Sequence, residues 1–284
     1  MQTAANQGFA ASLSAIDWTR PWFGPFATVG ARLAAAVAGG ASLHACLNEQ
    51  AAAAGLHNAR GLPLRFTAQD ELPAGTAYEA HIHATGAVPT RDNLHDFFNA
   101  LIWLHFPQAK VRLNALQAEV IQCAGVQAGR GGVRDAATLF DENAVLFLST
   151  DASLEAALRG FGWQELFVRR RPNWGDRCVA VPFGHALLEK LVSPYKSVTA
   201  HAWPLALPPA SAGSTMVDSA VAASLLAAAD AGRLRGGRSF TPLPVMGIPG
   251  WCDANADAAF YADVTVFRPG APGSRRLTGS PHWC

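Results

Sequence analysis

The stretch TRDNLHDFFNALIWLHFPQAK, residues 90–110, is apolar nearly all the way round but carries His95, Asp96 and Asn99 near its start. Residues three and four positions apart are neighbours on a helix surface, so these three side chains form one polar patch if the stretch is helical. Imidazole and carboxylate groups bind divalent cations and serve as general acids and bases. The patch is therefore a candidate metal-binding or substrate-binding site that lines a cleft.

A second group of such residues lies in GHALLEKLVSPYKSVTAHA, residues 184–202. His185 and Glu189 are four positions apart, and from a helix both can reach one divalent cation. His201 follows in an expected strand, which could fold back beside that helix. The candidate catalytic residues are thus His95, Asp96, Asn99, His185 and Glu189. The candidate metal ligands are His95, His185, Glu189 and His201.

Each group also has a purely structural interpretation. In the first, Asp96 helps to cap the first helical turn while His95 and Asn99 bond to neighbouring backbone. In the second, His185 and Glu189 form a plain hydrogen-bonded pair, which contributes only tenths of a kcal/mol. A single site requires the imidazoles of His95 and His185 to lie within about 12 Å of each other, because a direct ligand lies about 2.0–2.2 Å from its metal ion.

A third group of charged residues precedes the apolar run AVLFLST. Asp141 and Glu142 are adjacent acids in an expected strand turn, where they could ligate a cation or act as general acid and base. A solvated hairpin turn is the simpler interpretation. Arg134 and Asp135 form a local ion pair in the simplest view, and such a pair contributes little when exposed.

The first polar patch needs a helix to position it, and the sequence predicts one over residues 93–106. Asp92 or Asn93 can cap this helix, and Pro107 closes it. Its apolar residues point in nearly every direction, which is typical of a buried helix. Further helices are expected over residues 26–37, 42–55, 109–125, 184–192 and 217–237, with one helix or two over 151–167. Strands are expected over 177–183 and 197–205.

Two hairpins are expected as well. The first joins strands over residues 62–70 and 77–86, with His81 and His83 on one face, and the second spans residues 135–150 around the acidic turn. A glycine-rich loop is expected over residues 125–134. Helices mixed with antiparallel hairpins, without a strict βαβ rhythm, predict an α+β fold with a small sheet around one main core.

The expected organisation of the chain has three parts. Residues 1–40 form an N-terminal helical segment, and residues 41–240 form the main α+β domain. Residues 241–284 form a tail rich in proline and glycine, with too many of both for regular structure. The aromatic residues of this tail indicate that it packs on the body of the protein.

The overall composition argues against several classes of protein. The chain has 284 residues with 22 Lys and Arg against 21 Asp and Glu, so it lacks the basic field of general nucleic-acid or membrane-surface binding. It has no apolar run long enough to span a bilayer and no secretory signal. Its five cysteines form no CxxC pair, which favours a reducing compartment. We expect a soluble, cytoplasmic protein of undefined oligomeric state.

The well-known catalytic motifs are missing from the sequence. There is no GxSxG elbow, no HExxH and no P-loop. Residues 81–102 partly resemble a His-Me-finger nuclease, with His81 or His83 followed by Asn93. Leu101 and Ile102 stand where the helical histidine of such a nuclease is expected. The near-neutral charge gives a nuclease no further support.

Four stretches together resemble a known family. They are PTRDNLHDFFNALIWLHFP, RDAATLFDEN, GHALLEKLVSPYKSVTAHA and LPVMGIPGW. Their order and spacing resemble an uncharacterised bacterial family, domain of unknown function 3025, over roughly residues 40 to 270. The resemblance implies no activity, substrate or cofactor, because none is established for that family.

Two functional hypotheses follow from the sequence. The first is an enzyme of hydrolytic type, with or without a divalent cation, that binds an unidentified small molecule between the helices over 93–106 and 184–192. The second is a non-catalytic binding or scaffold protein whose buried polar groups only fix the fold. The two differ in whether polar side chains from distant parts of the chain surround a common cavity.

Overall fold

The computed structural model describes residues 2–124 and 131–270, which form an α+β fold as predicted. The helices are α1 (Gln2–Ser14), α2 (Ala27–Ala38), α3 (Leu43–Ala53), α4 (Tyr78–Thr85), α5 (Leu94–His105), α6 (Pro107–Ala124), α7 (Gly132–Asn143), α8 (Ala152–Arg159), α9 (His185–Lys190) and α10 (Thr215–Asp230). The strands are β1 (Arg65–Ala68), β2 (Ala87–Thr90), β3 (Ala144–Ser149), β4 (Cys178–Pro182), β5 (Thr199–Leu205) and β6 (Thr241–Pro244). Most of the expected glycine-rich loop and the last part of the expected tail, residues 271–284, lie outside the described residues.

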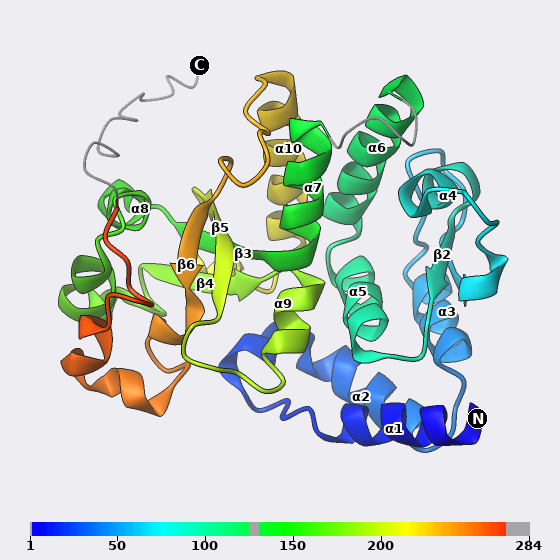
Figure 1. The fold of residues 1–284 in the computed structure, drawn as a ribbon, viewed down its shortest axis with the longest axis horizontal. Helices are drawn as coiled ribbons and strands as arrows, with labels where there is room; N and C mark the ends of the chain where they lie inside the picture. The colour runs from blue at the N-terminus through cyan, green and yellow to red at the C-terminus, as the bar shows by residue number, and fades with distance from the viewer. Residues whose placement is uncertain (1, 125–130, 271–284) are drawn as a thin grey trace.

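A four-stranded sheet in the order β4-β3-β5-β6 lies on one side of the molecule (Figure 1). Its inner strand β3 pairs antiparallel with β4 and parallel with β5. Every residue of β3 is buried, and its sequence AVLFLS is apolar up to the final serine. A continuous apolar run of this kind is typical of a strand that is covered on both faces. The strands predicted over 177–183 and 197–205 are confirmed as β4 and β5.

The helix predicted over residues 93–106 is confirmed as α5. Asn93 caps it, because its side-chain oxygen accepts a hydrogen bond from the backbone N–H of Asp96 at 2.7 Å. Pro107 ends α5 as expected, but it also begins α6. A proline is tolerated at the first helical position, where its missing N–H would have had no helical partner.

Helices α6, α7 and α10 lie side by side above α5 and α9 in the view of Figure 1. The start of α6 is capped by a residue from α10. The carboxylate of Asp218 accepts hydrogen bonds from the backbone N–H groups of Gln108 and Ala109 at 3.0 and 2.8 Å. This contact satisfies two donors that a helix leaves free at its start, and it joins α10 to α6.

The first predicted hairpin is wrong. The second of its two segments forms α4 instead of a strand, and β1 pairs in parallel with β2. Parallel strands need a crossover connection, and α4 supplies it. The alternation of polar and apolar residues indicated a strand with every second residue buried. In the structure Ile82 is the buried residue of α4, so the alternation does not correspond to burial. Gly86, at a φ of 75°, ends α4 in the left-handed conformation that glycine adopts readily.

The second predicted hairpin is also wrong. Helix α7 runs directly into β3 with no turn between them. Ala136, Ala137 and Phe140 are buried along α7, and these positions share one helical face. Asp141 and Glu142 therefore lie in the last turn of a helix and not in an exposed strand turn.

The segment after residue 240 has more regular structure than predicted. It contains β6, which pairs antiparallel with β5, and several short 3-10 turns. Trp251, Tyr261 and Phe267 are buried. These aromatic side chains hold the segment against the rest of the protein.

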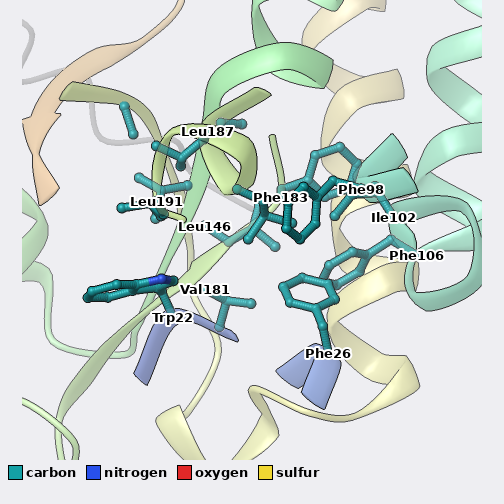
Figure 2. Packing of buried hydrophobic residues seen from close by; sticks show 14 of the residues in the cluster. Trp22, Phe26, Phe98, Ile102, Phe106, Leu146, Val181, Phe183, Leu187 and Leu191 are labelled. Carbon is teal, nitrogen blue, oxygen red and sulfur yellow. The ribbon is translucent and has the colours of Figure 1, made fainter. Parts of the chain in front are cut away.

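One cluster of buried hydrophobic side chains extends from Phe9 to Phe267. Figure 2 shows Trp22 and Phe26, which precede α2, facing side chains from α5, α9 and the sheet. Residues near the start of the chain are therefore part of the same core as the sheet.

Two aromatic contacts show how this core joins distant segments. The ring of Phe23 stacks on that of Phe98 in α5, with centroids 5.7 Å apart and an interplanar angle of 2°. The ring of Trp22 lies 5.6 Å from that of Trp251. Offset and tilted aromatic pairs at such distances contribute beyond the area they bury. The segment that precedes α2 thus holds both α5 and the segment after β6.

Candidate active site

Helix α9 packs against both α5 and α7 (Figure 1). A cavity of about 300 Å³ lies beside this contact, and α4 forms another part of its wall. The side chains that line it include Tyr78, Glu79, His95, Asn99, Glu142 and His185. The cavity therefore brings together polar groups from four helices that are far apart in the chain.

The imidazoles of His95 and His185 meet at this cavity. Their Nε2 atoms lie 3.1 Å apart, although the residues are 90 positions apart in the sequence. The side chain of His185 is only 5% exposed, and that of His95 is 33% exposed. One proton or one metal ion can therefore contact the Nε2 atoms of both rings.

A carboxylate faces the other nitrogen of each ring. Glu189 Oε2 lies 3.0 Å from His95 Nδ1, and Asp141 Oδ2 lies 3.7 Å from His185 Nδ1. A carboxylate at Nδ1 favours the tautomer that carries its proton there and leaves the Nε2 lone pair free. Two such lone pairs at 3.1 Å repel each other unless a proton or a cation lies between the rings.

The pKa shifts of His185 and Glu142 act on metal binding in opposite directions. Burial lowers the pKa of His185 to about 4, so its imidazole is neutral at neutral pH. Burial also raises the pKa of Glu142, although the nearby His95 opposes this shift. Neutral imidazole and carboxylate are the forms in which these side chains bind a metal ion.

Three side chains offer donor atoms at distances that suit one metal ion. Donor atoms of His95, Glu142 and His185 all lie within 4.8 Å of one another. Glu142 Oε2 is 3.6 Å from His185 Nε2. Ligands about 2.1 Å from a metal ion are separated from each other by roughly 3.0–3.4 Å at octahedral to tetrahedral angles. The half-exposed carboxylate of Glu142 needs only a small movement to complete such a set.

A buried lysine supports the site from behind. Lys110 Nζ donates to Asp141 Oδ1 at 2.5 Å and to Asn99 Oδ1 at 2.8 Å, and it lies 5.2 Å from the ring centroid of Trp103. Burial alone would raise the pKa of Asp141, but the charge of Lys110 and its hydrogen bond bring the pKa below its usual value. Asp141 therefore stays ionised between Lys110 and the imidazole of His185.

The other candidate residues have different surroundings. The carboxylate of Asp96 lines the cavity but binds the backbone N–H and the guanidinium of Arg91 at 2.7–3.0 Å. His201 lies on β5 with its ring 5.0 Å from that of Phe240, outside the group of three metal-donor residues. His95 and Asn99 bond to side chains from other helices and not to neighbouring backbone.

A family model described as "Protein of unknown function (DUF3025)" matches residues 64–271. The chain belongs to this family. The family prediction is therefore confirmed, and the matched DUF3025 region contains every residue of the cavity wall named above. None of the curated proteins and none of the solved structures matches the chain. Among residues 2–124 and 131–270, no helix combines the length and the apolar character that crossing a bilayer requires.

Several polar residues of the DUF3025 region were not among the candidate site residues. The sequence indicates Glu142 as a cation ligand or general acid and base only within an expected strand turn, and it gives Lys110 no role. Tyr78 and Glu79 lie on α4, which was predicted to be a strand. One signal could have pointed to Lys110. Apolar positions follow it at helical spacing, which indicates a buried helical face, and a buried lysine requires an acidic partner.

A close backbone contact in the DUF3025 region sets the distance between Glu142 and His185. A Cβ atom on Gly184 would lie 2.4 Å from the backbone nitrogen of Asn143 and 2.5 Å from the backbone oxygen of Glu142. The Gly184 N–H also donates to the backbone oxygen of Ala144 at 2.9 Å. Only glycine allows the start of α9 to approach the end of α7 this closely.

We therefore expect Gly184→Ala to lower the free energy of unfolding by about 1–3 kcal/mol, because the added methyl group forces the backbone apart. Urea denaturation followed by circular dichroism measures the change. Gly213→Ala is the matched control, since a Cβ atom there meets nothing within 4 Å. Equal unfolding midpoints for the two variants would contradict the proposed role of the contact.

Proposed function

We propose that this protein is a metal-dependent hydrolase whose metal ion is bound by His95, His185 and Glu142. The observation that carries the proposal is the 3.1 Å approach of two imidazole Nε2 atoms, with a carboxylate facing Nδ1 of each ring. A hydrogen bond from carboxylate to imidazole to metal is a recurrent arrangement in metal sites. Glu189 has that orienting role for His95. Asp141 faces His185 Nδ1 at 3.7 Å, and this nitrogen has no hydrogen-bond partner among the described residues.

The donor set favours zinc over magnesium or calcium, because two of the three ligands are imidazoles. Three protein ligands leave a coordination position open for water or substrate, as in catalytic zinc sites. Zinc at such a site lowers the pKa of water and polarises a carbonyl or phosphoryl group. The proposed reaction is the addition of water across an acyl bond of a small molecule in the cavity.

Glu79 is the proposed carrier of the proton in this reaction. It lines the cavity, and its Oε2 accepts a hydrogen bond from Asn114 Nδ2 at 2.6 Å. Burial raises the pKa of Glu79, and a raised value suits a group that both accepts and donates a proton. The oxygen of water forms a bond to the acyl carbon, and Glu79 accepts its proton. The bond to the leaving nitrogen or oxygen breaks, and Glu79 returns the proton to that atom.

The prediction of a cytoplasmic location remains part of this proposal. Within the described residues Cys46, Cys123, Cys178 and Cys252 are all free thiols, as favoured in a reducing compartment. The alternative of a non-catalytic scaffold shares the buried Lys110 contacts but requires no metal ion. Metal content therefore separates the two hypotheses.

The test is metal analysis of protein purified without an affinity tag and equilibrated with a small excess of zinc. We expect about one tightly bound zinc ion per chain and hydrolysis of at least one member of a panel of esters, phosphoesters and peptides. Iron in place of zinc would point to oxygenase chemistry, which also uses two histidines and one carboxylate. A folded protein that binds no divalent metal would contradict the proposal.

A further inference from the structure

A chain of hydrogen bonds fixes the role of the Tyr78 hydroxyl. Lys110 Nζ donates to Asn99 Oδ1, and Asn99 Nδ2 donates to the hydroxyl oxygen of Tyr78 at 3.1 Å. An ammonium group can only donate hydrogen bonds. The amide oxygen of Asn99 must therefore face Lys110, and the amide nitrogen must face Tyr78. The phenolic oxygen is the acceptor at the end of this chain.

The hydroxyl hydrogen of Tyr78 is left for another partner. Tyr78 lines the cavity, and the amide of Asn99 is the one hydrogen-bond partner of its hydroxyl among residues 2–124 and 131–270. Burial holds the pKa of Tyr78 well above its usual value, so the hydroxyl keeps its hydrogen at neutral pH. A donor that the protein has already oriented needs little reorganisation when a ligand binds.

The charges around the cavity restrict the ligand. Glu79, Asp141 and Glu142 line it, whereas the guanidinium of Arg91 is bound by the carboxylate of Asp96. Lys110 offsets the charge of Asp141, and the proposed zinc ion offsets those of Glu79 and Glu142. The cavity then has no net positive charge to attract a phosphate or carboxylate ligand, and it suits an uncharged or amine-bearing one. The volume, about 300 Å³, lies at the lower end of small-molecule sites.

We infer that the cavity binds a small amide or ester, uncharged or bearing an amine, and that Tyr78 donates a hydrogen bond to its carbonyl oxygen. Asn99 is the positioning residue for this donor. The carbonyl oxygen gains negative charge as water adds to the adjacent carbon, so a fixed donor at that oxygen stabilises the transition state. The inference rests on the proposed function, because it places the carbonyl group next to the proposed metal ion.

The test uses zinc-loaded protein and acetohydroxamate, a small chelating probe that presents a carbonyl oxygen. Isothermal titration compares the wild type with Tyr78→Phe and Asn99→Asp. We expect each variant to bind the probe about 10-fold more weakly, because each loses one hydrogen bond to it, with unchanged affinity for zinc. In Asn99→Asp the new carboxylate has no hydrogen to donate to the Tyr78 hydroxyl. The Tyr78 hydroxyl therefore donates its hydrogen to this carboxylate and no longer points that hydrogen into the cavity. Tyr195→Phe, at an exposed tyrosine, is the control.

The double variant Tyr78→Phe with Asn99→Asp distinguishes orientation from a general structural role. We expect it to bind acetohydroxamate no more weakly than either single variant, because both changes remove the same hydrogen bond. Wild-type binding by Asn99→Asp with a retained thermal midpoint would overturn the inference, even if Tyr78→Phe fails to fold. Tighter binding of inorganic phosphate than of acetohydroxamate would overturn the amide or ester class. A wild type without zinc would overturn the proposed function and this inference together.

Discussion

Replacing His185 with alanine is expected to weaken zinc binding by on the order of 10²- to 10³-fold. In structural zinc sites a binding free energy of roughly 10–16 kcal/mol is shared among four ligands, and the loss of one ligand removes about a quarter of it. His185 is the most buried of the three proposed ligands, and its Nε2 faces both His95 Nε2 and Glu142 Oε2. Competition with a chromophoric chelator measures the affinity. We expect a similar loss in His95→Ala.

Two further variants make this prediction specific. Glu189→Gln alters the carboxylate that faces His95 Nδ1 and is expected to weaken zinc binding less, by about 10- to 100-fold. His201→Ala is the matched control, because its ring packs against Phe240 and not against the site. Equal zinc affinities for His185→Ala and His201→Ala would rule out a metal ion between the two imidazoles.

Replacing Lys110 with alanine is expected to lower the free energy of unfolding by about 3–5 kcal/mol, because the variant leaves the buried charge of Asp141 without its partner. The Lys110 ammonium is 2.5 Å from that carboxylate, and both side chains are almost fully buried. Urea denaturation of zinc-free protein measures the loss without a contribution from the metal ion. The unfolding midpoint should fall well below that of any surface variant.

The double variant Lys110→Met with Asp141→Leu tests the cause of this loss. Apolar residues of similar volume remove both charges, and such replacements of buried pairs are often neutral or stabilising. We expect the double variant to recover most of the stability that Lys110→Ala loses. Arg159→Ala breaks the exposed pair with Glu155 and should change stability by less than about 1 kcal/mol. A double variant as unstable as Lys110→Ala would show that the lysine acts mainly through packing.

Helix α5 was predictable because its apolar residues, its Asn93 cap and Pro107 all indicate the same boundaries. The alternation over residues 77–86 was ambiguous, since a short segment with one buried residue fits either a helix or a strand. The parallel pairing of β1 and β2 decides that question, and it depends on contacts between distant residues. Local pattern could not reveal it.

The site was predictable in part. The sequence identified His95 and His185 from their types and spacing, but their approach depends on how α5 and α9 pack. Glu142 was misplaced for a local reason: the acidic run before an apolar strand has the composition of a turn. The buried face of α7, which includes Phe140, extends the helix to that position instead. His201 lies on the predicted strand, yet the register of β5 directs its ring towards Phe240.

The aromatic contacts of Trp22 and Phe23 bear on how the protein can be divided for experiments. The family match begins at residue 64, so a fragment with those boundaries would lack both rings. The faces of Phe98 and Trp251 that they cover would then be open to solvent, and exposed apolar surface of this kind promotes aggregation. A fragment cut at the family boundary is therefore expected to be less soluble than the full chain, and deletion series should keep the segment Pro21–Phe26.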